Sequence, residues 1–199
     1  MAQATKIIVK KISNSIPEDT HLKSQFGGQP YFDKGEKWPT SKAGTPLDFV
    51  FQVYNEGNIN LPGNVKLIQF YYGFDWDWDI AYDDDERILV KVYENINKDG
   101  AVIIEEPKGL MKRNYCEIEY EEVESRENYE GESSYPKFSQ LGGYAQWVWA
   151  NTAPDDEDFQ LLFQLDSEYD AGLMWYDSGL VYVFYNPKSK QIEFRMQYY

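Results

Sequence analysis

Three consecutive stretches in the last third of the chain decide the fold: Ser139-Gln-Leu-Gly-Gly-Tyr-Ala-Gln-Trp-Val-Trp149, Phe159-Gln-Leu-Leu-Phe-Gln-Leu-Asp-Ser167 and Gly172-Leu-Met-Trp-Tyr-Asp-Ser-Gly-Leu-Val-Tyr-Val-Phe-Tyr185. They contain a glycine pair, an apolar run of strand length, a turn and a second apolar run. The chain as a whole is rich in aromatic and β-branched residues, which favours strands over helices. The sequence therefore predicts a glycine-hinged entry followed by two core strands that a turn connects.

A weaker copy of this region lies upstream. Ser24-Gln-Phe-Gly-Gly28 matches Ser139-Gln-Leu-Gly-Gly143, Phe49-Val-Phe-Gln-Val53 matches Leu161-Leu-Phe-Gln-Leu165, and Ile68-Gln-Phe-Tyr71 matches Tyr182-Val-Phe-Tyr185. The offsets between the copies are 115, 112 and 114 residues, so small changes in loop length separate them. Similarity at a nearly constant spacing indicates an internal duplication. Neither glycine pair has the pattern of a phosphate-binding loop, so we expect a shared backbone bend at both.

The rest of the chain predicts further strands and no long amphipathic helix. Apolar runs and alternating patterns place strands at Leu47–Tyr54, Val65–Phe74, Arg87–Glu94, Tyr115–Val123 and Gln191–Tyr199. The expected class is mainly β (α+β at most), with an internally duplicated, sandwich-like sheet and one or two short helices. We expect an N-terminal repeat over 1–124, a polar joint over 125–138 and a C-terminal repeat over 139–199, both halves sharing one compact domain.

The charge of the chain restricts its partners. There are 34 acidic and 19 basic residues, which give a formal net charge of −15. Such a chain repels phosphate backbones and anionic lipids, so we expect neither nucleic acid nor a membrane as partner. A basic protein partner is favoured instead. The single cysteine, Cys116, cannot form an intramolecular disulfide, and no signal peptide is evident, so a cytoplasmic location is expected.

An acidic insertion, Asp75-Trp-Asp-Trp-Asp-Ile-Ala-Tyr-Asp-Asp-Asp-Glu86, lies between two predicted strands. Its aromatic side chains could anchor a basic partner that its carboxylates orient. The candidate contact residues are Asp75, Trp76, Asp77, Trp78, Asp79, Asp83, Asp84, Asp85 and Glu86. A plain strand end, with tryptophans inward and aspartates in water, explains the same pattern.

The insertion is also a candidate calcium site. Five carboxylates occupy ligand positions of a twelve-residue calcium loop: Asp75, Asp77, Asp79, Asp83 and Glu86. Two features differ from an EF-hand. Ile80 stands where that loop needs glycine, and the flanking segments are predicted strands rather than helices.

No catalytic constellation stands out. His21 is the only histidine and is far in sequence from Cys116, which disfavours both a nucleophilic triad and a usual zinc site. A carboxylate-based hydrolase would need a pair of acids, and no pair differs from the acidic background. Trp147 and Trp149 would share one strand face and could stack sugar rings or partner side chains, but core packing is their expected use.

Several short motifs resemble those of one protein family. They are Gly27-Gly28-x-Pro30-Tyr31, Trp38-Pro39, Pro46-x-x-Phe49-x-x-Gln52 and Leu67-x-Gln69-Phe70, then Leu141-Gly142-Gly143-Tyr144, Leu161–Ser167 and Met174-Trp175-x-Asp177-x-Gly179. With them the chain resembles the YwqG-like family from about Gln25 to Tyr185. It departs from the family pattern at Ala145, where proline is usual, and at Tyr176, where glycine is usual. The resemblance implies a duplicated, β-rich fold and supplies no catalytic residues. It also implies an immunity-type role, since some relatives occur beside secreted toxin genes.

Together these observations predict a non-catalytic protein-binding protein. The expected role is that of an immunity-type protein that neutralises a basic toxin through an acidic and aromatic surface, without a cofactor. The alternative is a module that binds calcium or a small ligand through residues 75–86. The third hypothesis is a carboxylate-based hydrolase, whose signature would be a deep acid-lined pocket with perturbed pKa values.

Overall fold

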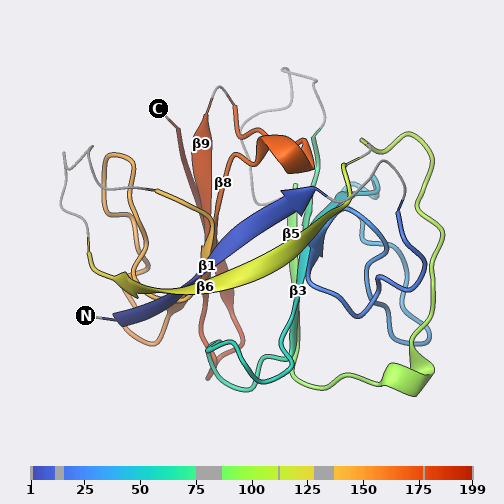
Figure 1. Cartoon of the computed structure of the whole chain (residues 1–199), viewed down its shortest axis with the longest axis horizontal. Coiled ribbons are helices and arrows are strands. Elements are labelled where there is room, and N and C mark those ends of the chain that lie inside the picture. The colour runs from blue at the N-terminus through green and yellow to red at the C-terminus, as the bar shows by residue number, and fades with distance from the viewer. Residues whose placement is uncertain are drawn as a thin grey trace. The chain divides into compact units, whose positions relative to one another are not determined.

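The structure is a computed structural model of the chain, and it describes residues 2–11, 16–74, 87–111, 113–127, 137–176 and 178–198 (Figure 1). The described residues form ten strands: β1 (Ala2–Lys11), β2 (Gln25–Phe26), β3 (Asp48–Tyr54), β4 (Leu67–Tyr72), β5 (Ile88–Tyr93), β6 (Cys116–Ser125), β7 (Gln140–Leu141), β8 (Gln160–Asp166), β9 (Gly179–Tyr185) and β10 (Ile192–Tyr198). They also form two 3-10 helices, η2 (Lys98–Gly100) and η3 (Tyr169–Ala171). The predicted mainly β class is confirmed. In these ranges no helix combines the length and the apolar character that crossing a bilayer requires.

The ten strands form one antiparallel sheet in the order β10-β9-β8-β7-β1-β6-β2-β3-β4-β5. Figure 1 shows β8 and β9 side by side, in agreement with their hydrogen-bonded pairing. The chain divides into two compact units. We call Lys11–Glu56 with Val65–Glu117 the N-terminal unit, and Met1–Lys10 with Gly57–Asn64 and Ile118–Tyr199 the C-terminal unit.

In the N-terminal unit, β2, β3, β4 and β5 are successive neighbours, and the first two residues of β6 pair with β2. All six residues of β4 and six of seven in β3 are buried, which explains why these strands are mostly apolar, with one buried glutamine in each, Gln52 and Gln69. A core cluster on this sheet consists of Phe32, Leu47, Phe49 and Tyr71. Four partly buried side chains pack against the cluster: Trp38, Leu89, Val102 and Ile104.

The C-terminal unit has the same arrangement. Its strands β7, β8, β9 and β10 are successive neighbours, and β1 pairs with β7. Every residue of β9 is buried. The core cluster of this unit consists of Ala145, Trp147, Leu161, Leu180, Tyr182 and Phe184, with Val148 and Phe159 packed against it.

The stretches with similar sequences hold the same positions in the two units. Phe26 of β2 pairs with Phe51 of β3, and Leu141 of β7 pairs with Phe163 of β8. In both units the register of the second strand of the pair, β3 or β8, shifts at the residue just before Phe51 or Phe163. Such a bulge bends a strand and increases its twist.

The glycine pairs explain this shared bulge. Gly27 donates its backbone N–H to the carbonyl of the bulge residue Val50 at 3.1 Å, and Gly142 donates to Leu162 at 3.3 Å. Both glycines have positive φ angles, 58° and 61°, which L-residues rarely adopt. The expectation of a shared backbone bend at the glycine pairs is confirmed.

Two expectations from the sequence differ from the structure. The first concerns the third matched stretch, in which the sequence match equates Tyr182 with Ile68. In the sheet, Tyr182 pairs with Gln164 in the same way that Gln69 pairs with Gln52. The structural counterpart of Tyr182 is therefore Gln69, and the sequence match was wrong by one residue. The segment that holds the two tryptophans 147 and 149 forms no strand. The first tryptophan is buried in the core as expected, whereas the second is 54% exposed.

Candidate functional site

The acidic insertion over 75–86, predicted as the contact or calcium site, lies outside the described residues. This range contains every candidate site residue: Asp75, Trp76, Asp77, Trp78, Asp79, Asp83, Asp84, Asp85 and Glu86. The chain enters it from β4 and leaves it into β5, so the expected strands on both sides are confirmed. An EF-hand has helices at these places. Partner contact and calcium binding at the insertion both stay predictions.

Where the chain is described, no cluster of three or more His, Cys, Asp or Glu side chains could hold a metal ion. Cys116 is fully buried.

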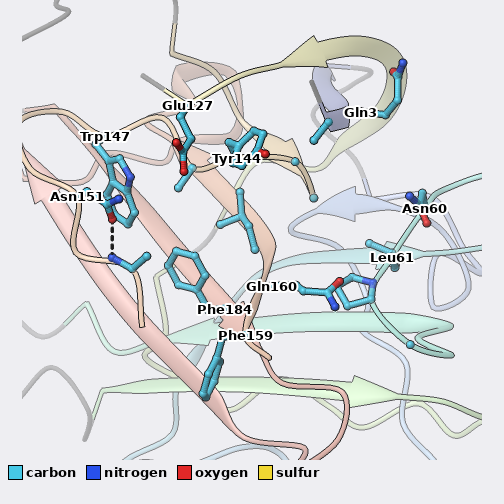
Figure 2. A pocket seen from close by; sticks show the side chains of 18 residues that line it. Gln3, Asn60, Leu61, Glu127, Tyr144, Trp147, Asn151, Phe159, Gln160 and Phe184 are labelled. Carbon is cyan, nitrogen blue, oxygen red and sulfur yellow. Dashed lines mark hydrogen bonds between the residues drawn. The ribbon is translucent and has the colours of Figure 1, made fainter. Parts of the chain in front are cut away.

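A cavity of about 660 Å³ is present within the C-terminal unit (Figure 2). Its lining combines aromatic and amide side chains. The aromatic residues are Tyr144, Trp147, Phe159 and Phe184, and the amide residues are Gln3, Asn60, Asn151 and Gln160. Figure 2 shows Trp147 and Asn151 toward one end, Gln3 and Asn60 toward the other, and Gln160 between them.

Ring contacts fix the apolar side of this cavity. The Trp147 and Phe184 rings are nearly parallel, at 18°, with centroids 6.0 Å apart. The Trp147 ring also packs against Tyr182, at 4.6 Å between centroids. The Tyr182 hydroxyl donates a hydrogen bond to the Gln146 carbonyl at 2.9 Å, which ties the tryptophan segment to β9. Such packing holds side chains in single rotamers.

The glycine pair of the C-terminal unit positions Tyr144. Gly143 precedes it with a φ of 72°, which turns the chain after β7. The Tyr144 N–H then donates to the Ser125 hydroxyl at 2.9 Å, and its carbonyl accepts from the Gln140 side-chain nitrogen at 2.9 Å. With its backbone fixed in this way, Tyr144 lines the cavity and is 40% exposed.

The polar side of the cavity has side-chain donors and acceptors that are available to a ligand. The Asn151 side-chain oxygen accepts from the Ala153 N–H at 2.9 Å, drawn in Figure 2, and so leaves its amide hydrogens for other partners. The side chains of Gln3, Asn60 and Gln160 are exposed and make no hydrogen bond within the described part of the chain. These groups can donate to a ligand and accept from it.

The corresponding position of the N-terminal unit has different surroundings. There Val102 and Ile104, from the segment after β5, pack against the equivalent aromatic cluster. Asp48, the counterpart of Gln160, accepts hydrogen bonds from the backbone N–H groups of Phe74 at 3.3 Å and Met111 at 2.5 Å. The carboxylate at this position is therefore hydrogen-bonded within its unit, whereas the Gln160 side chain is exposed.

A second group of functional side chains lies at the end of β8. Ser139 donates its hydroxyl to Glu168 at 2.5 Å and accepts from the Asp166 N–H at 3.0 Å. Burial raises the pKa of Glu168 to about 7; the Ser139 hydrogen bond opposes this, and the Asp166 and Asp170 carboxylates add to it. Burial also raises the pKa of Asp166, against a hydrogen bond from the Ser167 N–H. Neither of these carboxylates lines the cavity.

A third group is the partly buried polar network of the N-terminal unit. The Glu36 carboxylate accepts from Lys91 at 2.5 Å, from the Asp33 N–H at 2.7 Å and from the Tyr93 hydroxyl at 3.0 Å. Burial raises the pKa of Glu36, but these donors outweigh burial and lower it below its usual value. Lys91 also lies 5.1 Å from the centre of the Phe32 ring. Each group has a partner, so the network stabilises the fold.

The connection between β8 and β9 and the end of β10 carry four exposed hydrophobic side chains. Tyr169 is 75% exposed, Tyr176 45% and Met174 39%. The Tyr176 ring contacts Tyr198, which is 53% exposed, at 5.3 Å between centroids. We call these four residues the aromatic surface. Tyr176 has a φ of 49°, in the left-handed region.

Sequence reasoning missed the cavity, the Ser139–Glu168 hydrogen bond and the aromatic surface. The cavity draws on distant segments with ordinary amide residues, so it has no local signal. The aromatic surface had one signal, the tyrosine at position 176 where the resembling family usually has glycine.

Comparison with protein families identifies the family of the chain and leaves its chemistry open. The chain belongs to the family described as Domain of unknown function (DUF1963), whose model matches residues 24–198. The match covers both units. A comparison with curated proteins found no match.

Proposed function

We propose that this protein is a non-catalytic binding protein of the cytoplasm whose partner is a basic protein. In its most concrete form it is an immunity-type protein that neutralises a basic toxin domain. We also propose that, within its family, the chain is a YwqG-like member, on the motifs that both halves carry. The aromatic surface supports binding, and the net charge of −15 supports a basic partner.

The single observation that carries this proposal is the backbone of Tyr176. A residue other than glycine costs about 1–2 kcal/mol in the left-handed region. Strain of this kind is retained where the side chain has a function. Here it presents a half-exposed ring against Tyr198, at a position where YwqG-like proteins usually have glycine.

The surroundings of the aromatic surface supply the matching charge. Tyr169 stands between Glu168 and Asp170 in the chain, and Asp170 is exposed. Aromatic side chains contribute much of the affinity at protein interfaces, while neighbouring charges guide encounter and orientation. A basic partner gains from both. The acidic insertion over 75–86 is a separate candidate contact for a basic partner.

The test uses the tagged full-length protein to capture partners from a cell lysate at low salt. We expect one stoichiometric basic protein that moderate salt displaces, because screening weakens exposed charge pairs. With that partner purified, Tyr176→Gly should lower the affinity about tenfold while the melting temperature stays equal or rises. Ile103→Ala removes an exposed hydrophobic side chain of the N-terminal unit and is the matched control.

Two results would contradict this proposal. One is a tight complex whose affinity does not change with salt. The other is equal affinity of the Tyr176→Gly variant and the unchanged protein.

A further inference from the structure

We propose that the cavity of the C-terminal unit binds an uncharged, hydroxyl-rich ring compound of the mono- or disaccharide class. This proposal does not depend on the basic partner, because no residue of the aromatic surface lines the cavity. It rests on the size of the cavity, its lining, its charge and its contrast with the N-terminal unit.

The size of the cavity suits a small molecule. Pockets that enclose small ligands measure roughly 300–1,000 Å³, and this one measures about 660 Å³. That volume accepts one or two sugar rings. A protein segment would need a longer groove or a flat face of larger area.

The aromatic side gives a stacking surface. Tyr144 is 40% exposed and Phe159 is half-buried, so a ligand can reach both rings, while Trp147 and Phe184 pack on each other and form the wall behind them. The C–H faces of a sugar ring are apolar and flat, so they bury favourably against aromatic rings. Because core contacts fix Trp147, little conformational entropy is lost when a ligand binds.

The amide side matches hydroxyl groups. A hydroxyl both donates and accepts, as a side-chain amide does. The side chains of Gln3, Asn60 and Gln160 make no hydrogen bond within the described part of the chain, and the Asn151 side-chain nitrogen keeps its hydrogens for a ligand. A ligand rich in hydroxyls can satisfy all four side chains. A purely apolar ligand would leave them unpaired at a cost.

The charge of the lining argues for a neutral ligand. Among the described residues that line the cavity, Glu127 is the one with a charged side chain, and none is basic. An anion such as a phosphate would be repelled by this carboxylate and by the net charge of −15. A cation is disfavoured as well, because one exposed carboxylate is a weak partner and the side-chain N–H groups of Asn151 are donors, which repel a positive charge.

The N-terminal unit differs from the C-terminal unit at the polar edge of the cavity. Val102 and Ile104 pack against the equivalent cluster there, and Asp48 accepts hydrogen bonds from backbone N–H groups. In the C-terminal unit the counterpart of Asp48 is Gln160, whose amide faces the cavity. At this position one copy of the duplicated fold thus has a carboxylate bonded within its unit, and the other has an amide that a ligand can use.

The test is ligand-observed NMR on the full-length protein, with titration to obtain dissociation constants. The probes are glucose, galactose, N-acetylglucosamine, maltose and cellobiose, compared with glucose 6-phosphate as an anion and arginine methyl ester as a cation. We expect at least one neutral sugar to bind with a dissociation constant of about 1 mM or lower. Both charged probes should bind at least about tenfold more weakly.

Variants locate the binding. Tyr144→Ala and Gln160→Ala change side chains that are exposed in the cavity, so the fold should survive, which the melting temperature checks. Each should weaken sugar binding about tenfold or more, whereas Tyr169→Ala, outside the lining, should leave it unchanged. The proposal is overturned if no neutral sugar binds, if a charged probe binds best, or if both cavity variants bind as the unchanged protein does.

Discussion

Gln52 and Gln164 occupy the same hydrogen-bonding position in the two units. The side-chain oxygen of Gln52 accepts from the Tyr31 N–H at 2.9 Å, and that of Gln164 accepts from the Gln146 N–H at 2.7 Å. Each side-chain nitrogen donates to a backbone carbonyl just before the unit's glycine pair. Both side chains are fully buried. A glutamine in each repeat thus joins two chain segments that do not pair as strands.

Replacing either glutamine should destabilise its unit. Gln164→Leu leaves buried backbone groups without partners, so we expect a loss of about 2–4 kcal/mol in the free energy of unfolding. The measurement is urea unfolding followed by tryptophan fluorescence. Gln160→Leu is the control, because that side chain is exposed on the same strand, and it should change stability by less than about 0.5 kcal/mol. Equal losses in the two variants would show that these hydrogen bonds contribute little.

The second glycine of the C-terminal pair should tolerate no side chain. A Cβ atom on Gly143 would lie 2.7 Å from the Ala4 Cβ and 2.7 Å from the Ser125 hydroxyl, and its φ is 72°. Gly143→Ala should therefore cost about 2–4 kcal/mol, from backbone strain and overpacking together.

Gly44 separates the two contributions. Its φ is 85°, but a Cβ there would meet nothing within 4 Å. Gly44→Ala should cost about 1 kcal/mol from backbone strain alone. Thermal unfolding of both variants measures the difference. If Gly44→Ala is as damaging as Gly143→Ala, close approach is not the reason for the glycine pair.

The strands were predictable because their signal is local. β4 and β9 are buried on both faces, so their sequences are almost entirely apolar, and Gln69 of β4 is the exception. The glycine pair was predictable because the same bend recurs in both repeats. The register of the third matched stretch was wrong by one residue, since similar aromatic runs match almost equally well when shifted and only hydrogen bonding fixes the pairing.

The candidate sites were less predictable because they join distant segments. The cavity brings Gln3, Asn60 and Asn151 together, and none of them differs locally from an ordinary surface amide. Tyr176 gave a signal, as an aromatic residue where glycine is usual, but its meaning needed the φ angle. The sequence instead predicted a site at the densest run of carboxylates, because a local concentration of charge can be recognised without knowing the fold.

Calcium binding at the acidic insertion has a direct test. If Asp75, Asp77, Asp79, Asp83 and Glu86 hold the ion, millimolar calcium should raise the melting temperature by several degrees, because a ligand of the folded state stabilises it. Asp77→Asn combined with Glu86→Gln should abolish this shift, and magnesium should give a smaller one. If the shift persists in the double variant, calcium binds elsewhere. If calcium does not shift the melting temperature of the unchanged protein, the insertion does not bind calcium.

The pH dependence of stability should report on Glu168. Its pKa rises from 4.5 in the unfolded chain to about 7 in the folded protein, so folding takes up a proton between these values. The contribution of this group to the free energy of unfolding is therefore complete below about pH 4.5 and is lost as the pH rises through about 7. Glu168→Gln keeps an oxygen that can accept the Ser139 hydrogen bond but cannot ionise. We expect equal stability of variant and unchanged protein near pH 4.5, and a gain of about 1–3 kcal/mol for the variant at pH 8. Urea unfolding at both pH values measures this difference, and a variant that is no more stable at pH 8 would show that Glu168 ionises in the folded protein without a penalty from burial.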